Sequence, residues 1–202
     1  MKIKQIESIL KQDKAIIVAE TPSCQWLGNG DALYPVYNLP KLTKENIFTL
    51  FDIAEDKREK FYFKELELPI PLNLEDNDDT EVLIERDTMS IIARGRVLEP
   101  LKTSQGMAFI NQRYLKPFAN EENGYELYER TNNHGRTYIA VKGGFMLLGI
   151  IGTYDLVDDN FISTIKSWLE LSRVTMLNKA QEKGENIDSQ LHLYNEEKAA
   201  DE

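Results

Sequence analysis

The chain has 202 residues, of which 42% are hydrophobic, 29% charged and 9% aromatic. These proportions are typical of globular domains and exclude collagen-like and intrinsically disordered chains. The formal net charge of -10 argues against a protein that coats nucleic acid with its whole surface, because such binding depends on Lys and Arg side chains. A local basic patch is compatible with this charge.

The cysteine content and the apolar runs predict a cytoplasmic protein. Cys24 is the single cysteine of the sequence, so it cannot form an intramolecular disulfide or complete a four-ligand zinc site. Residues 1–7 alternate apolar with charged side chains and lack the apolar core of a signal peptide. The longest apolar run, residues 145–151, is far shorter than the ~20 residues that cross a bilayer. We expect no membrane partner.

The first predicted elements are a short helix and three strands. Ile3, Ile6, Ile9 and Leu10 recur at helical spacing and predict an amphipathic helix over residues 2–12. Residues 14–20 read as a buried strand, and the Gly-Asn-Gly-Asp turn at 28–31 predicts a hairpin between residues 24–27 and 32–37. Since proline lacks a backbone donor, Pro35 predicts an edge strand or a bulge.

Thr43 is the predicted N-cap of the next helix, which carries Ile47, Phe48, Leu50 and Phe51. Residues 61–68 then alternate apolar with polar side chains, as a half-buried strand does. The acidic, turn-rich loop that follows is the best candidate for a boundary between two similar halves of the chain, near residues 72–81.

The second half predicts short strands and a long helix. Strands are expected over residues 89–93, 97–101, 107–110, 125–130, 136–141 and 145–151, with a turn or short helix over 111–118. Asn-Asn-His-Gly at 132–135 predicts a hairpin turn within a three-stranded meander. A helix capped by Asp158 or Asp159 should run to about residue 183, with one broad apolar face.

These elements predict an α+β fold with mainly antiparallel sheets, a short N-terminal helix and a long C-terminal helix. Residues 1–184 would form a single domain, or two similar halves, and residues 185–202 a polar C-terminal tail. The segments that open the halves, residues 14–19 and 89–94, are alike in their strand pattern, which ordinary β-strand composition also explains.

The sequence predicts no catalytic residue, no metal site and no cofactor. The acidic segment 76–81 lacks the glycine and the final glutamate of a calcium loop. His134 and His192 are far apart in sequence, and no phosphate-binding loop or nucleophile elbow occurs. We therefore favour a non-enzymatic protein, with an enzyme whose site has no known motif as an alternative.

Basic and aromatic residues between positions 94 and 142 form a candidate nucleic-acid-binding surface, since aromatic rings interleaved with Lys and Arg bind single strands. The candidates are Arg94, Arg96, Arg113, Arg130, Arg136 and Tyr138, with Tyr114, Lys116, Tyr125, Tyr128 and Lys142 nearby. The alternative is that Tyr and Arg are ordinary residues of solvent-facing strands.

The tail contains the segment Gln190-Leu191-His192-Leu193-Tyr194. It resembles the peptide by which bacterial proteins bind the replication sliding clamp, whose pattern is Gln-Leu, a variable residue, Leu and an aromatic residue, usually Phe. This resemblance implies that Leu191, Leu193 and Tyr194 enter an apolar cleft of the clamp while Gln190 bonds at its rim. Alternatively, Ile187, Leu191 and Tyr194 have the i, i+4, i+7 spacing of a last helical turn that would pack on the body.

Two further likenesses bear on context. The segment 125–130, Tyr-Glu-Leu-Tyr-Glu-Arg, is similar to segments of proteins encoded in prophages, which implies a mobile genetic element and no particular mechanism. The order of strands, turn, short helix and meander in each half is similar to a sliding-clamp domain. The leading expectation is thus an accessory protein that meets the replication machinery through its tail, with a nucleic-acid-binding or clamp-like module as the alternative.

Overall fold

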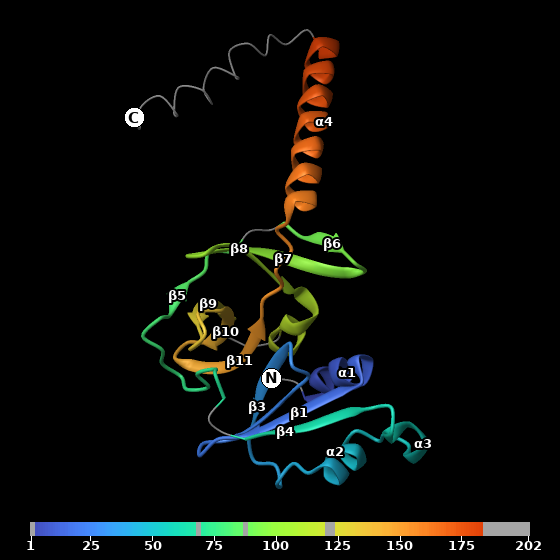
Figure 1. Ribbon diagram of the computed structural model, residues 1–202, viewed down its shortest axis with the longest axis vertical. Helices are drawn as coiled ribbons and strands as arrows, with labels where there is room; N and C mark the ends of the chain where they lie inside the picture. The colour runs from blue at the N-terminus through green and yellow to red at the C-terminus, as the bar shows by residue number, and fades with distance from the viewer. Residues whose placement is uncertain (1–2, 68–69, 87–88, 120–123, 184–202) are drawn as a thin grey trace. The chain divides into compact units, whose positions relative to one another are not determined.

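The computed structural model describes residues 3–67, 70–86, 89–119 and 124–183 (Figure 1). The chain divides into two compact units, Met1–Asp155 and Leu156–Glu202. The fold is α+β, with a short N-terminal helix, mainly antiparallel sheets and a long C-terminal helix, which confirms the predicted class. None of the helices in the described part of the chain combines the length and the apolar character that crossing a bilayer requires.

The first part of the chain forms the predicted helices and strands and, in addition, a short helix over Glu55–Arg58 that was not predicted. They are α1 (Ile3–Asp13), β1 (Ala15–Glu20), β2 (Gln25–Gly28), β3 (Ala32–Val36), α2 (Lys44–Leu50), α3 (Glu55–Arg58) and β4 (Tyr62–Leu66). The helical spacing of Ile6, Ile9 and Leu10 places all three side chains in the core. Thr43 caps α2 as predicted, because its Oγ1 accepts a hydrogen bond from the Asn46 N–H at 3.3 Å.

The next elements form a hairpin sheet, a 3-10 helix and the meander. They are β5 (Val82–Leu83), β6 (Ile91–Ala93), β7 (Arg96–Thr103), β8 (Gly106–Asn111), η1 (Gln112–Phe118), β9 (Glu126–Thr131), β10 (Thr137–Gly143) and β11 (Met146–Gly152). The predicted β9–β10 turn is confirmed. Its Asn132 Oδ1 accepts from the backbone N–H groups of His134 and Arg136, both at 2.9 Å, and Gly135 supplies the positive φ of 74°.

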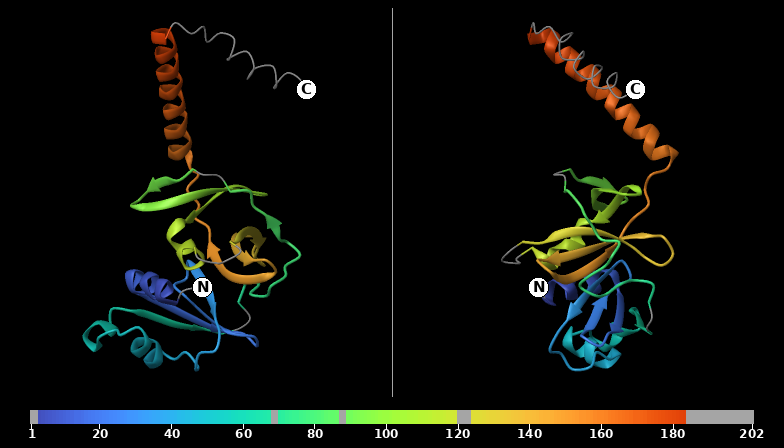
Figure 2. Two further views of the ribbon diagram at one scale, coloured as in Figure 1. Left: turned by 180° about the vertical axis from the view of Figure 1, so that it is seen from behind. Right: turned by 90° about the vertical axis from the view of Figure 1, so that its left-hand side faces the viewer.

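One sheet combines strands from both sides of residues 72–81. Its order is β4-β1-β2-β3-β11-β10-β9-β5, with β1 and β4 parallel and the other neighbours antiparallel, while β6, β7 and β8 form a second antiparallel sheet. In both views of Figure 2 the second sheet lies on one side of the β9–β11 meander and β1–β4 on the other. The segment that follows β11 meets the second sheet where Tyr154 forms an isolated antiparallel bridge to Phe109 of β8.

The prediction that Pro35 lies in an edge strand is wrong. Strand β3 sits between β2 and β11, and its register with β2 is regular through Pro35. The pairing of β3 with β11 covers Ala32 and Leu33 and stops before Pro35. A missing backbone donor at Pro35 therefore interrupts no pairing with β11.

Side-chain alternation along the strands gives the large sheet an apolar layer on each face. Ile139 and Val141 of β10 belong to the larger core, together with α1, α2 and η1. Tyr138 and Ala140 of the same strand belong to a smaller cluster with Trp26 and other residues on the opposite face. Burial on both faces explains why β10 reads as a nearly continuous apolar run.

The acidic loop at residues 73–81 is bound to the meander by a buried arginine. The Arg130 side chain is fully buried, and its Nη1 and Nη2 donate to the carbonyls of Glu75 and Asp76 at 2.9 and 3.0 Å. Its Nε donates to Glu81 at 2.9 Å, and Lys142 donates to the other oxygen of Glu81 at 2.6 Å. The loop is thus part of the packed body of Met1–Asp155.

The second unit contains α4 (Asp159–Lys183). Asp158 caps this helix as predicted, since its Oδ1 accepts from the Phe161 N–H at 2.7 Å. The expected apolar face is present in the sequence of the helix, but Trp168, Leu169 and Met176 are 58%, 65% and 68% exposed.

Candidate anion-binding site

The first part of the site is an arginine held by a buried carboxylate. Glu99 lies in β7 and is almost fully buried, and it binds Arg86 through two parallel bonds, Nε to Oε1 at 2.7 Å and Nη2 to Oε2 at 3.0 Å. The hydrogen bond to Glu99 is the main reason that the pKa of Arg86 is raised. Two-point binding fixes the plane of the guanidinium.

A second arginine, Arg113 of η1, is bound to a carboxylate of α1. The Arg113 Nη2 donates to Asp13 Oδ2 and to the Tyr114 hydroxyl, both at 2.7 Å. Burial lowers the pKa of Arg113, but its bonds to Tyr114 and Asp13 outweigh this effect, so the net shift is upward. Its Nε is buried and has no hydrogen-bond partner in the described part of the chain.

A polar network behind Arg113 fixes its position. The Tyr114 hydroxyl donates to Asp31 Oδ2 at 2.9 Å and accepts from Asn29 at 3.1 Å. Tyr154 donates to the same Asp31 oxygen at 2.7 Å. Burial, followed by the bond to Asp31, raises the pKa of Tyr154, which keeps the phenol protonated as a donor. The β2–β3 turn that carries Asn29 and Asp31 requires glycine at Gly28, because a Cβ there would lie 1.8 Å from the Ala32 carbonyl oxygen.

Each of three arginines has a tyrosine ring against its guanidinium. The distances from the guanidinium carbon to the ring centroid are 5.2 Å for Arg86 on Tyr125, 5.1 Å for Arg96 on Tyr154 and 4.8 Å for Arg113 on Tyr114. Such cation–π contacts restrict the side chains without neutralising them. The three guanidinium groups are therefore held in place. Arg86 and Arg113 also have a carboxylate partner each, whereas Arg96 has no ion pair within the described residues.

These side chains meet in a pocket of about 470 Å³, which we call the arginine pocket. Its cationic side chains are those of Arg86, Arg96, Arg113 and Lys116, and among the described residues that line it there is no Asp or Glu. The other lining residues are Gln12, Gly95, Val97, Asn111, Gln112, Leu115, Ala119 and Tyr125. Guanidinium and ammonium groups at one surface bind phosphate or carboxylate oxygens. The pocket is suited to holding an anion.

The structure places the six candidates for nucleic-acid binding in three different environments: the arginine pocket, a second cavity and the interior. Arg96 and Arg113 line the arginine pocket, and Arg94 lies beside it in the β6–β7 turn with a positive φ of 51°. Arg136 lines a different cavity.

Arg130 and Tyr138 do not belong to the surface. Arg130 is committed to the acidic loop, and Tyr138 is buried with its hydroxyl bonded to the Asn73 N–H at 3.1 Å. Their positions follow from the pleat of the meander, which turns these two side chains inward.

Sequence reasoning missed Arg86 and its partner Glu99. Arg86 lies between Glu85 and Asp87 in the sequence, after the apolar residues 82–84, and no local pattern marks it as part of a site. The one available signal was Glu99, a charged residue inside a strand whose neighbours Leu98 and Leu101 are apolar. A charge at such a position needs a partner of opposite sign, which sequence alone does not identify.

The predicted clamp-binding residues Gln190, Leu191, Leu193 and Tyr194 lie outside the described residues. Within the part that is described, no three His, Cys, Asp or Glu side chains gather as a metal ion would require. Comparisons with known protein families, with curated protein sequences and with solved structures find no significant match to this chain.

Proposed function

We propose that this chain is a non-enzymatic accessory protein that binds a nucleic-acid backbone through phosphate groups held in the arginine pocket. The observation that carries the proposal is the fixed arrangement of Arg86, Arg96 and Arg113, each set against a tyrosine ring. Fixed guanidinium groups lose little freedom when a phosphate binds, and this favours recognition. These side chains favour binding over catalysis, since the described residues that line the pocket include no Ser, Thr, Cys, His, Asp or Glu.

The net charge of -10 limits how many phosphates of a nucleic acid the protein would contact. An acidic protein repels the phosphates outside its basic pocket, so contact is confined to a few nucleotides. The counterion release from three or four phosphates of a single strand gives a slope of log K against log salt of about -2 to -3. This is shallower than the slope of a protein that wraps its ligand.

Titration of the full chain with fluorescent single-stranded DNA and RNA at several salt concentrations tests the proposal. Changing Arg96 and Lys116 together to Gln should weaken binding about tenfold or more and make the slope less steep by about one unit or more, because the two charges contact phosphates. Lys102→Gln is the matched control, since Lys102 is an exposed cation of the same strand, β7, outside the pocket.

Equal binding by the pocket variant and the control would contradict the proposal. Binding of free nucleoside triphosphate without binding of either oligonucleotide would also contradict it, and would assign the pocket to a small phosphorylated ligand instead.

A second candidate function rests on the tail sequence Gln190-Leu191-His192-Leu193-Tyr194. It is the docking of this chain on a bacterial sliding clamp, as part of a mobile genetic element. A peptide of residues 185–202 should bind purified clamp with a Kd on the order of micromolar, because few anchors supply the energy. The double change of Leu191 and Leu193 to Ala should abolish binding, measured by fluorescence polarisation. A peptide that does not bind, or an alanine variant that binds equally, would refute this candidate.

A further inference from the structure

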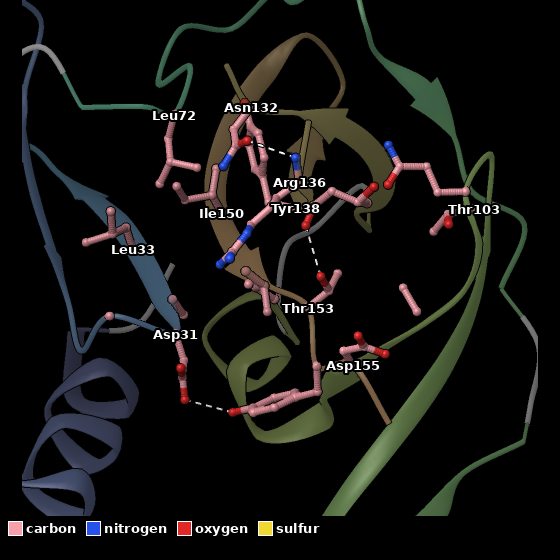
Figure 3. A pocket seen from close by; sticks show the side chains of 18 of the residues that line it. Asp31, Leu33, Leu72, Thr103, Asn132, Arg136, Tyr138, Ile150, Thr153 and Asp155 are labelled. Carbon is pink, nitrogen blue, oxygen red and sulfur yellow. Dashed lines mark hydrogen bonds between the residues drawn. The ribbon is translucent and has the colours of Figure 1, made fainter. Parts of the chain in front are cut away.

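A second cavity, of about 730 Å³, lies in Met1–Asp155 and is separate from the arginine pocket (Figure 3). Its walls come from the β2–β3 turn, the tip of the β7–β8 hairpin, the β9–β10 turn, and β11 with the residues that follow it. This volume is typical of sites for small molecules. The polar groups that line it indicate which kind of ligand it would bind.

Hydrogen bonds between the walls make the cavity preformed. The buried Glu129 accepts from the Ser104 N–H at 2.7 Å and from the Ser104 hydroxyl at 2.6 Å, which ties the β7–β8 tip to β9. Gln105 donates to the Gly135 carbonyl at 3.3 Å, and Thr153 donates to the Thr137 carbonyl at 2.9 Å. A ligand would therefore meet walls that are already in place.

One end of the cavity presents hydrogen-bond donors. The side-chain oxygen of Asn132 is used by the backbone of its own turn, so its amide nitrogen remains for another partner. Arg136 is exposed, and its guanidinium forms no ion pair within the described residues. Figure 3 shows its side chain extending into the cavity. A guanidinium beside an amide donor is suited to a carboxylate.

Two carboxylates line the cavity away from these donors. Asp31 is held by Tyr114 and Tyr154 through its Oδ2. Asp155 also lines the cavity, and no ion pair with a cation among the described residues neutralises it. Figure 3 shows both carboxylates away from Asn132 and well apart from each other, so one group cannot bond to both. Asp155 is not part of the tyrosine network, and it is the carboxylate suited to an ammonium group.

Between the two ends the wall is apolar. Leu33, Leu72 and Ile150 line the cavity there, and Figure 3 shows their side chains on the same side of it. This surface can cover an aliphatic group of a ligand and gain the free energy of its burial.

We propose that this cavity binds a small zwitterion of the amino-acid or dipeptide class. The carboxylate of the ligand bonds to Arg136 and Asn132, its ammonium group bonds to Asp155, and an aliphatic side chain packs on Leu33, Leu72 and Ile150. The site is independent of the arginine pocket, because none of these residues lines that pocket.

Calorimetric titration of the full chain with four probes tests the assignment. The probes are free leucine, alanyl-leucine, N-acetyl-alanyl-leucine, which lacks the ammonium group, and alanyl-leucine amide, which lacks the carboxylate. At least one of the two zwitterions should bind, and each blocked dipeptide should bind about tenfold or more weakly, because each loses a charge-assisted bond. Tighter binding of leucine than of the dipeptide would assign the site to free amino acids.

Two variants locate the ligand's charged groups. Arg136→Gln should weaken the zwitterion about tenfold and remove the discrimination against the amide, while Asp155→Asn should remove the discrimination against the acetylated probe. Lys64→Gln and Asp79→Asn are matched controls on exposed residues outside the cavity, and both should leave binding unchanged. Thermal unfolding of every variant confirms that it is folded.

The assignment is overturned if neither zwitterion binds up to about 10 mM, or if the blocked probes bind as tightly as the free ones. It is also overturned if the two cavity variants, while folded, bind all four probes as the unchanged protein does.

Discussion

Arg130 and Arg136 lie at the two ends of the β9–β10 turn and have opposite environments. The guanidinium of Arg130 is enclosed by the carboxylate of Glu81 and the carbonyls of Glu75 and Asp76. Arg136 is exposed and has no ion pair in the described chain. Removing a buried cation affects stability chiefly through the groups that lose their donor. Here these are the partly buried carboxylate of Glu81 and the carbonyls of Glu75 and Asp76.

Replacing Arg130 by Ala should therefore lower the free energy of unfolding by about 3–5 kcal/mol, because Glu81 keeps Lys142 as its one remaining partner. Arg136→Ala should change it by about 0.5 kcal/mol or less, as surface substitutions usually do. Urea unfolding followed by circular dichroism measures both. Similar changes for the two variants would show that the acidic loop does not depend on Arg130.

At the scale of elements, two hairpin turns of Met1–Asp155 are held in position by hydrogen bonds to neighbouring elements. The β7–β8 tip is bound to β9 by Glu129 and Ser104, and the β2–β3 turn is bound to η1 through the Tyr114 hydroxyl. Turns usually vary in position, but these turns carry polar side chains that bond to neighbouring elements. Both turns line the larger cavity, and the β2–β3 turn also supports Arg113 of the arginine pocket through the Tyr114 hydroxyl, which explains how loops can present charged groups at constant positions.

Helix α4 contributes differently from these elements. The two core clusters are formed by residues between Ile6 and Ile151, so neither includes a side chain of α4. A chain that ends at Asp155 should consequently fold with a Tm within a few degrees of the full chain, because it keeps both clusters. Differential scanning calorimetry of the two chains tests this. A loss of cooperative unfolding in the shorter chain would show that α4 is needed for the core.

For the whole molecule, the sequence predicted the elements well and their assembly poorly. Alternation and helical spacing identified α1, the meander and α4, since these patterns depend on neighbours in the chain. The parallel pairing of β1 with β4 and the central position of β3 depend on contacts between distant segments, so no local pattern encodes them.

The same distinction applies to the candidate site. Arg96 and Arg113 were identified by composition, but nothing local brings Arg86 from one segment, Asp13 from α1 and Glu99 from β7 around them. Arg130 has the same residue type as Arg136 and a similar sequence neighbourhood, and three-dimensional packing alone separates their roles.

The pairing of β3 with β11 has a consequence for how the protein is made. Leu33 pairs with Ile150, so a strand from the beginning of the chain lacks its neighbour until nearly all of Met1–Asp155 has been synthesised. At ribosomal rates of about 5–20 residues per second, this interval is on the order of ten seconds. During that time β1–β3 have an unpaired strand edge, which is a template for association with other chains. The nascent protein is thus most exposed to aggregation just before its last strand, β11, is released, and a chaperone that covers β3 would protect it.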